Sequence, residues 1–437
     1  MAEISYNRSL PVRHEVDVLV VGGGPAGCAA AVAAARQGAK VFLVEAQGCL
    51  GGLGTAGMVP AYMCFSDGEN FCAAGIGEEI LHRMWEYGNY GDFDRPLSIR
   101  VEALKRVYDD LLLEAGVEFV FHTQLVDVIM DGQKIDSCVF ASKSGMYAVK
   151  AKVYIDGTGD ADVAAWAGAP FKQGDENGKV MASTLCSLWA GIDFKNAKKG
   201  PDNQRIEEAY NDGVFEKLDM HLPGMWKITE SIGGGNIGHV YDVDGTDERS
   251  LTKGLIDGRK LYSQYEEYYK KYLTGYENME MVMTGAILGI RETRRIEGDY
   301  VLVLQDFLDR AVFDDEIGRY CYPVDIHASN NSMASFKEFM KDHTGYRYQK
   351  GENYGVPYRI MLPKNVENLY VTGRSVSTDR YMQSSIRVMP GCYITGQAAG
   401  VGAALCVKDD KTPRTVDVHK VQKILKDMGA YLPNFKE

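Results

Sequence analysis

Short runs of apolar residues alternate with glycine-rich turns at both ends of the chain. Four of these runs are almost wholly apolar, which predicts strands buried on both faces, at residues 16–21, 40–44, 153–155 and 368–372. An alanine-rich stretch at 28–37, which Gly38 ends, predicts a helix between the first two strands. These segments together predict a β-α-β unit and a parallel sheet.

Other periodic patterns predict hairpins and long helices. Apolar residues at helical spacing predict a helix over 98–116, with Ser98 as its N-cap and Gly116 as its end. Strand-like segments separated by turn signals, which are typical of hairpins, lie at 117–122, 124–130, 134–142 and 146–151. From about residue 176 tyrosines and charged residues become frequent. A tyrosine-rich helix in this region is expected to be capped by Thr246 or Asp247. The glycine-rich segment 233–238 follows no buried strand and is expected to form a loop of this region.

Composition limits the class of protein and its partners. The chain has 437 residues, a length that predicts two or three domains. Its 48 Lys and Arg residues face 60 Asp and Glu residues, which gives a formal charge of -12. Neither nucleic acid nor an anionic membrane surface is therefore expected as a partner. No stretch reaches the roughly 18 uninterrupted apolar residues that would span a bilayer.

The cysteines and histidines indicate no metal site. Nine cysteines are scattered without a C-x-x-C pair, and the eight histidines show no ligand spacing with one another or with cysteine. We therefore expect no disulfide framework, no metal and no iron–sulfur centre. A polar N-terminal segment predicts no secretory signal, and a cytoplasmic location would suit the free thiols.

The strongest chemical signal is the motif Gly22-x-Gly24-x-x-Gly27, which lies between the first strand and the first helix. Glycines at these positions permit a tight turn, a close approach of backbone N–H groups to a pyrophosphate, and close packing of helix on strand. An acid, Glu45, ends the next strand and is suited to accept hydrogen bonds from ribose hydroxyls. The pattern predicts a dinucleotide site with an unphosphorylated ribose.

Two further segments resemble ligand-binding turns. Residues 48–57 contain five glycines, which let a backbone lie flat against a ligand, although a flexible surface loop would have the same composition. Residues 156–160 follow a buried strand, so they are expected at the carboxyl edge of the sheet, where ligands bind. An ordinary turn that leads into a helix is the alternative there.

A long apolar helix is expected to begin near Pro390 and Gly391. Its N-terminal donors, together with the cation of Arg387, would stabilise an anion that binds at its first turn. A buried structural helix, with Arg387 in a surface salt bridge, is the alternative.

Catalytic candidates lie between these segments. Arg291, Arg294 and Arg295 are close in sequence and either clamp a polar substrate or pair with nearby acids. His327 follows a strand-like stretch at 321–326 and is either a base near neutral pH or a satisfied core residue.

Taken in order, these blocks resemble the FAD-dependent oxidoreductase family, whose relatives include the fumarate reductase flavoproteins. The resemblance covers nearly the whole chain and rests on 22–27 with Glu45, 50–57, 156–162, 289–299, 322–327, 371–374, 385–391 and 396–400. It implies FAD as the cofactor. The residues that it implies for FAD binding are Gly22, Gly24, Pro25, Ala26, Gly27, Glu45, Ala46, Gly51, Gly52, Thr55, Leu125, Val126, Gly157, Thr158, Gly159, Asp160, Gly373, Arg374, Arg387, Gly391 and Cys392. The catalytic candidates are His327, Arg387 and Arg291.

The expected fold class is α/β. A Rossmann-like FAD-binding domain, with a parallel sheet and a β-meander, is split into residues 1–175 and 355–437. An inserted α+β substrate domain is expected at 176–354.

The resemblance implies hydride transfer between a small polar organic substrate and flavin N5. Dehydrogenation at a C–OH or C–N carbon is favoured slightly over reduction of an activated C=C bond. A flavin monooxygenase or halogenase, and a non-catalytic electron carrier, are the alternatives. The electron partner is left open, as is a homo-oligomeric state.

Overall fold

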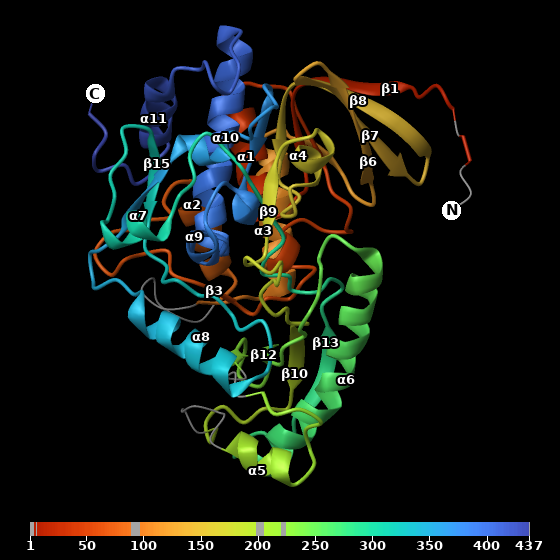
Figure 1. Cartoon of the computed structure of the whole chain (residues 1–437), viewed down its shortest axis with the longest axis vertical. Helices are drawn as coiled ribbons and strands as arrows, with labels where there is room; N and C mark the ends of the chain where they lie inside the picture. The colour runs from red at the N-terminus through yellow and green to blue at the C-terminus, as the bar shows by residue number, and fades with distance from the viewer. Residues whose placement is uncertain (1–3, 6, 89–96, 198–204, 220–223, 437) are drawn as a thin grey trace.

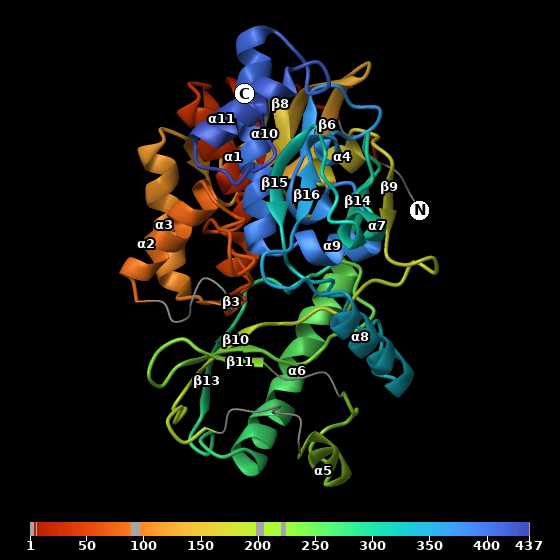
Figure 2. The same ribbon diagram turned by 90° about the vertical axis from the view of Figure 1, so that its left-hand side faces the viewer.

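The structure is a computed structural model. It describes residues 4–5, 7–88, 97–197, 205–219 and 224–436, except for the side chains of residues 343 and 344. Figures 1 and 2 show an upper part built on a large sheet and a lower part that contains the long helix α6 (Glu248–Tyr272).

The large sheet has the order β5-β2-β1-β8-β7-β6, and β17 also pairs with β8. Its strands are β1 (Val12–Val21), β2 (Val41–Val44), β5 (Glu118–Val120), β6 (Gln124–Asp131), β7 (Lys134–Ser142), β8 (Gly145–Asp156) and β17 (Leu369–Val371). Pairing is parallel from β5 through β8 to β17 and antiparallel among β8, β7 and β6. The predicted α/β fold with a parallel sheet and a β-meander is confirmed, and β17 joins the sheet from near the other end of the chain.

The prediction of two separate strands at 146–151 and 153–155 was wrong. One continuous strand, β8, runs over both segments, since it pairs antiparallel with β7 over 145–149 and parallel with β1 over 148–156. In the register of the sheet Val21 lies opposite both Val44 and Asp156, and Val371 also lies opposite Asp156. The turns after β1, β2, β8 and β17 are therefore gathered at one edge of the sheet.

Helices α1 (Pro25–Arg36) and α10 (Met389–Asp409) pack side by side against this sheet (Figure 1). The contact is close because both helices present small residues. A Cβ atom added at Gly396 or Gly400 would overlap the backbone carbonyl of Ala26 or Ala30. The apolar sequence of α10 is explained by this packing, since its residues from Met389 to Cys406 are buried.

The remaining elements of the upper part cover the sheet and its edge. They are α2 (Ile76–Glu86), α3 (Val101–Glu114), α4 (Asp162–Trp166), α7 (Leu304–Leu308), α9 (Arg380–Ile386), α11 (Val418–Asp427), β3 (Ala61–Tyr62), β4 (Leu97–Ser98), β15 (Glu316–Tyr320) and β16 (Tyr354–Pro357). The expectation that Ser98 caps α3 was wrong. Ser98 is buried in β4, where it pairs with Ala61, and Arg100 occupies the N-cap position.

The lower part contains an antiparallel sheet of order β11-β12-β10-β13, with α6 packed beside it. Its strands and short helix are β10 (Ser187–Ala190), β11 (Gly224–Lys227), β12 (Gly233–Asn236), β13 (Glu280–Thr284) and α5 (Ile206–Asn211). As predicted, Asp247 caps α6, and its carboxylate accepts a hydrogen bond from the Ser250 N–H at 2.7 Å.

The glycine-rich segment 233–238, which the sequence predicts to be a loop, begins as strand β12. A Cβ atom at Gly235 would lie 2.8 Å from Oγ of Ser187, and one at Gly234 would overlap Pro60. Crowding by the neighbouring strand and by Pro60 therefore requires glycine in a strand.

Residues of the 176–354 segment contribute to more than one hydrophobic core. One cluster is formed entirely by residues between 185 and 290. Leu302, Ile317 and Tyr354 belong instead to the cluster that contains α1 and α10, although they lie within the 176–354 range. Strands β9 (Phe171–Gln173) and β14 (Arg294–Ile296) form a separate two-stranded pair. Helix α8 (Met333–Gly345) begins six residues after His327 in sequence.

Within the described part of the chain, no helix combines the length and the apolar character that crossing a membrane requires.

Candidate active site

The turn at 22–27 requires glycine at two positions. Gly22 has φ of +96°, and a Cβ atom there would lie 2.6 Å from the carbonyl oxygen of Gly157. At Gly27 an added Cβ would overlap the carbonyl oxygen of Gly22. Both glycines therefore serve close packing of the turn, of α1 and of the end of β8.

Gly24 has different surroundings, because it faces open space. Of the atoms that the structure describes, a Cβ atom there would meet only the carbonyl oxygen of Gly157, at 3.9 Å. Gly24 is the N-cap of α1 and provides no side-chain cap, and Pro25 begins the helix. The start of α1 therefore has room beside Gly24, which fits the pyrophosphate of a dinucleotide.

Glu45 lies at the end of β2 and is buried. Its carboxylate accepts hydrogen bonds from the N–H groups of Gly23 (2.6 Å) and Gln47 (2.7 Å). Burial raises the pKa of this carboxyl group, while these backbone donors oppose the shift. Glu45 thus ties the glycine turn to the end of β2. Ala46 follows Glu45 in sequence and precedes the donor Gln47.

The loop at 48–57 lies against the same turn. The N–H of Gly51 donates to the carbonyl oxygen of Gly23 at 2.7 Å, and a Cβ atom on Gly52 would lie 3.2 Å from Cα of Gly24. The hydroxyl of Thr55 donates to the carbonyl of Leu50 at 2.5 Å and so closes the loop. Gly51, Gly52 and Thr55 are therefore brought together with the glycine turn.

Leu125 and Val126 lie on β6, beyond Thr123, whose N–H donates to the carbonyl of Glu45 at 3.1 Å. The side chain of Leu125 is buried in a core cluster, and that of Val126 is 38% exposed.

The segment 156–160 carries a buried carboxyl group at its start. Asp156 accepts hydrogen bonds from the N–H and hydroxyl of Thr158 and from the N–H of Ala164. Burial raises the pKa of Asp156 to about 6, although these hydrogen bonds oppose the shift. The carboxyl group therefore fixes the shape of the turn that contains Gly157, Thr158 and Gly159.

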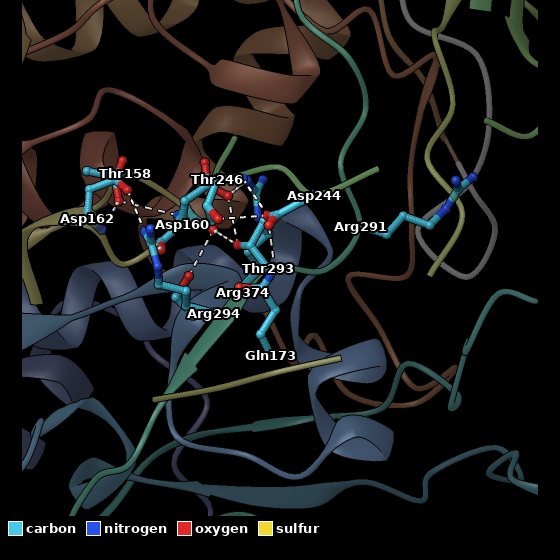
Figure 3. Close-up of polar contacts among 12 residues, drawn as sticks. Thr158, Asp160, Asp162, Gln173, Asp244, Thr246, Arg291, Thr293, Arg294 and Arg374 are labelled. Atoms are coloured by element: carbon cyan, nitrogen blue, oxygen red, sulfur yellow. Dashed lines mark hydrogen bonds and ion pairs between the residues drawn. The ribbon is translucent and has the colours of Figure 1, made fainter. Parts of the chain in front are cut away.

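Polar side chains from distant segments gather around Asp160 (Figure 3). Its carboxylate accepts from the Arg374 guanidinium at 2.6 Å and from the Thr293 hydroxyl at 2.7 Å. Arg294 donates to Asp162 at 2.7 Å and to the backbone carbonyl of Asp160 at 3.0 Å. Arg294 is thus part of an internal ion-pair network, one of the two possibilities that the sequence left open.

The start of α10 lies close to the start of α1. Gly373 lies between them, because a Cβ atom there would be 3.3 Å from Cβ of Ala26 and 3.7 Å from Sγ of Cys392. Val388 is the N-cap of α10 and provides no side-chain cap. The helix begins at Met389, one residue before the predicted start, with Gly391 and Cys392 in its first turn. Burial raises the pKa of the Cys392 thiol to about 12, so this thiol is neutral.

Arg387 precedes this helix and contacts the segment that contains His327. Its Nη2 atom donates to the Asp325 carboxylate (3.1 Å) and to the Asp325 carbonyl (3.0 Å). The same carboxylate oxygen accepts from the Tyr322 hydroxyl at 3.1 Å and lies 3.4 Å from Nε2 of His327. The guanidinium Nε of Arg387 is buried and has no hydrogen-bond partner among the described residues.

His327 is buried, which fits either role that the sequence allowed, but its local structure differs from the expectation. The predicted strand at 321–326 is absent from this described segment, because β15 ends at Tyr320. Burial, followed by the nearby Arg291 cation, lowers the pKa of His327 to about 3, so the imidazole is neutral.

Arg291 lies apart from the network of Arg294 and Arg374 (Figure 3). It donates to the Ala182 carbonyl at 2.7 Å, to the Thr184 hydroxyl at 3.0 Å and to the Asn236 side-chain oxygen at 3.3 Å. Burial, followed by the charge of Arg387, lowers the pKa of Arg291 to about 10. The third arginine, Arg295, pairs with Glu292. Of the three arginines, Arg291 is the one whose charge acts on His327 and is influenced by Arg387.

Sequence reasoning missed His239, Asp219 and Tyr241. Nε2 of His239 lies 3.2 Å from Nδ1 of His327, and Nδ1 of His239 lies 3.1 Å from both the Asp219 carboxylate and the Tyr241 hydroxyl. His239 and His327 are 88 positions apart, and neither lies in a recognisable spacing, so no local pattern could have paired them.

Two surface hollows of about 430 and 450 Å³ lie elsewhere. One is lined by residues of α2 and the other by residues of α6, and neither is lined by the residues described above.

A family model for FAD-dependent oxidoreductases matches residues 17–425. The chain belongs to this family. Its cofactor is accordingly FAD, and it is an enzyme of the oxidoreductase class.

Individual relatives match more locally. The chain is 49% identical over 47 residues to a dihydrolipoyl dehydrogenase of Trypanosoma brucei brucei, which is 11% of this chain and 10% of that protein. It is 28% identical over 158 residues to a 3-hydroxybenzoate 6-hydroxylase of Klebsiella oxytoca, which is 32% of this chain and 39% of that protein. The chain thus spans well under half the length of these relatives.

Among solved structures, a geranylgeranyl bacteriochlorophyll reductase-like protein of Thermoplasma acidophilum is similar with a TM-score of 0.46 and 13% identity. The match covers 95% of this chain and 84% of that one.

Proposed function

We propose that the protein oxidises a small polar organic substrate at a carbon that carries oxygen or nitrogen, with hydride transferred to N5 of FAD. The observation that supports this proposal is the meeting of Arg387, Asp325 and His327 directly before α10. This position adjoins Gly373 and Cys392, where the first turns of α1 and α10 approach each other.

The glycine turns and the two helix N-termini are proposed to hold FAD. The open space beside Gly24 and the unpartnered Nε atoms of Arg374 and Arg387 fit an anionic cofactor. The residues proposed to contact it are Gly22, Gly24, Pro25, Ala26, Gly27, Glu45, Ala46, Gly51, Gly52, Thr55, Gly157, Thr158, Gly159, Gly373, Arg374, Arg387, Gly391 and Cys392, with Leu125, Val126 and Asp160 at the margin. When bound, FAD supplies a two-electron acceptor for the hydride.

Arg291 and Arg387 are proposed to bind the substrate. Both guanidinium groups are nearly buried. Among the described residues, Asp325 is the carboxylate that pairs with Arg387 and whose charge acts on Arg291. Two buried cations with one carboxylate leave an excess of positive charge, which an anionic ligand would neutralise. We therefore infer that the substrate carries a carboxylate or a similar anionic group.

His327 is proposed to accept the proton that leaves the substrate's O–H or N–H group. Its neutral state suits this role, because an imidazole that is already protonated cannot accept a proton. Asp325 lies 3.4 Å from Nε2 and would stabilise the imidazolium that forms.

Hydroxylation is the second candidate, because part of the chain is similar to a 3-hydroxybenzoate 6-hydroxylase. The two functions differ in their use of dioxygen. Oxidation of substrate needs no oxygen atom from O₂, whereas hydroxylation inserts one into the product. Product formed under strictly anaerobic conditions with stoichiometric flavin reduction would support the first function.

The site is tested by separate His327→Gln and Arg387→Met variants of the FAD-loaded protein. Each is expected to retain bound flavin and to lower the rate of flavin reduction by roughly 10² to 10⁴, because a proton acceptor or a charge is lost. His419→Gln, at an exposed position of α11, is the control and should keep the wild-type rate. Full activity in both variants would show that the assignment is wrong.

A further inference from the structure

Two imidazole rings form a buried chain between two carboxylates. The order is Asp219, His239, His327 and Asp325, with contacts of 3.1, 3.2 and 3.4 Å between successive groups. His239 and His327 are buried, and their ring planes are nearly perpendicular, at 89°. Arg387, directly before α10, contacts Asp325 at one end of this series, and Asp219 lies at the other end.

The two imidazole rings carry too few hydrogens for all the contacts among these four groups. Three contacts link the four groups, and each needs one N–H hydrogen if both carboxylates are ionised. Two neutral imidazoles provide only two N–H groups. One of the three contacts must therefore lack a hydrogen. This is not the contact between the two imidazoles, because two lone pairs would then face each other at 3.2 Å. One ring nitrogen thus presents a lone pair toward a carboxylate, and the four groups have room for one additional proton.

The geometry indicates where that lone pair lies. His239 Nδ1 faces the Asp219 carboxylate at 3.1 Å, so this nitrogen carries hydrogen. Its Nε2 then accepts from Nδ1–H of His327. The lone pair is left on Nε2 of His327, at the longest of the three contacts and on the side of Asp325 and Arg387.

The surroundings favour a charge on His239 over one on His327. His327 faces Asp325 but also the cation of Arg291, which lowers its pKa after burial. Burial and, to a smaller extent, the Arg291 cation also lower the pKa of His239, but Asp219 opposes that shift through its charge and its contact with the ring. The other charged or titratable groups at the chain are Arg387, Tyr322 and Tyr241, and Phe339 of α8 packs against the His327 ring.

We propose that Asp219 and His239 form a proton relay behind His327. This inference rests on the proposed function, in which His327 accepts the substrate proton. As Nε2 of His327 takes that proton, the proton on Nδ1 of His327 passes to Nε2 of His239. The resulting cation on His239 lies beside the Asp219 carboxylate, whose charge opposes the effect of Arg291 on this ring. No electrons are exchanged in these transfers, since the hydride leaves the substrate carbon separately.

The relay makes Asp219 a positioning residue with a distinctive effect on pH dependence. In Asp219→Asn the His239 cation loses its counter-charge, so the acid limb of the pH profile for anaerobic flavin reduction should move down by about one pH unit. The maximal rate should fall about tenfold. Glu216→Gln, which changes an exposed acid of the same segment, is the control and should leave the profile unchanged.

His239→Gln separates positioning from relay. A glutamine carbonyl can accept a hydrogen bond from Nδ1–H of His327, but it cannot take up the proton. We expect nitrogen-15 NMR of histidine-labelled holoenzyme to show the Nδ1–H tautomer of His327 in both wild type and this variant. The rate should nevertheless fall at least tenfold in the variant. Tyr241→Phe, which removes only a hydroxyl beside Asp219, gives a milder variant that is expected to fold.

The outcomes distinguish the relay from the proposed function. If no substrate reduces the flavin of the wild-type protein, the proposed function fails. In that case the NMR spectra still test which ring nitrogens of His239 and His327 carry hydrogen. An Nε2–H tautomer of His327 would overturn the relay. If substrate reduces the wild-type flavin but Asp219→Asn and His239→Gln keep the wild-type pH profile and rate, the relay alone is wrong.

Discussion

At the scale of single residues, Gly24 and Gly27 lie in one turn but have opposite surroundings. Gly24 faces open space at the start of α1, whereas Gly27 faces the carbonyl of Gly22. Gly24→Ala should therefore fold normally, since its φ of -70° suits any residue, and lose FAD affinity. Gly27→Ala should lower the stability of the fold itself, by roughly 1–3 kcal/mol. Flavin content and thermal unfolding of the two variants check this difference.

One result would contradict the role of Gly24. If Gly24→Ala keeps wild-type FAD affinity while remaining folded, the space at the start of α1 is not where the pyrophosphate binds. Gly38→Ala is not a suitable control for the stability of these variants. An alanine at φ of +88° would strain the backbone, although its Cβ would meet no described atom within 4 Å.

Asp156 gives a prediction for pH dependence. Its pKa is raised to about 6 in the folded protein, so between about pH 4 and 6 the folded state binds more protons than the unfolded state. The free energy of unfolding should therefore fall as pH rises through this window, by up to about 3 kcal/mol in total from this group. Urea unfolding of wild type and Asp156→Asn should reveal a shallower decrease in the variant. Equal pH slopes in the two proteins would contradict the raised pKa.

Residue-level reasoning from the sequence succeeded where backbone geometry alone dictates the residue type. The tight turn at Gly22 and Gly27 belongs to this class, because the chain path there excludes side chains. It could not find His239 or Asp219, because their roles depend on approaches between segments far apart in sequence. It also could not decide between ion pairing and substrate binding for Arg291 and Arg294, since the partners of each are set by the tertiary fold.

At the scale of elements, the contact between α1 and α10 depends on two glycines of α10. Gly396→Ala and Gly400→Ala would each place a methyl group against a backbone carbonyl of α1. We expect each to lower the free energy of unfolding by about 1–3 kcal/mol, despite the higher helix propensity of alanine. Gly345→Ala in α8 is the matched control, because its added Cβ meets no described atom within 4 Å. Chemical denaturation gives the comparison, and a gain of stability in both α10 variants would contradict the close packing.

Elements were predictable where one local signal decided them. The cap of α6 at Asp247 and the buried strands β1, β2 and β17 are examples. The prediction failed where pairing partners decide the structure. Strand β8 continues through the predicted break because β1 pairs with it there, and β12 is a strand because Pro60 and Ser187 crowd its glycines.

At the scale of the whole molecule, the protein has a core around α1 and α10 and a separate core within residues 185–290. FAD is expected to stabilise the first of these, because the proposed cradle is formed by turns at the sheet edge. Removing FAD should therefore lower the melting temperature, and excess FAD should restore it; at 100 times the dissociation constant, bound ligand contributes about 2.7 kcal/mol.

Hydrogen exchange can localise this effect. Loss of FAD should reduce protection most in α1, in the turn at 156–160 and in the first turns of α10, and much less in α6, which packs in the other core. A uniform loss of protection in both parts, or a change confined to α6, would contradict the proposed position of FAD.

The central claim is that FAD bound at the edge of the large sheet accepts hydride from a small anionic substrate held near Arg291, Arg387 and His327. Its most direct test is anaerobic titration of the purified, FAD-loaded protein with a panel of hydroxy and amino carboxylates, followed by flavin absorbance. We expect at least one such compound to bleach the flavin stoichiometrically in the absence of oxygen. The claim would be contradicted if none of these compounds reduced the flavin and oxygen-dependent hydroxylation were observed instead.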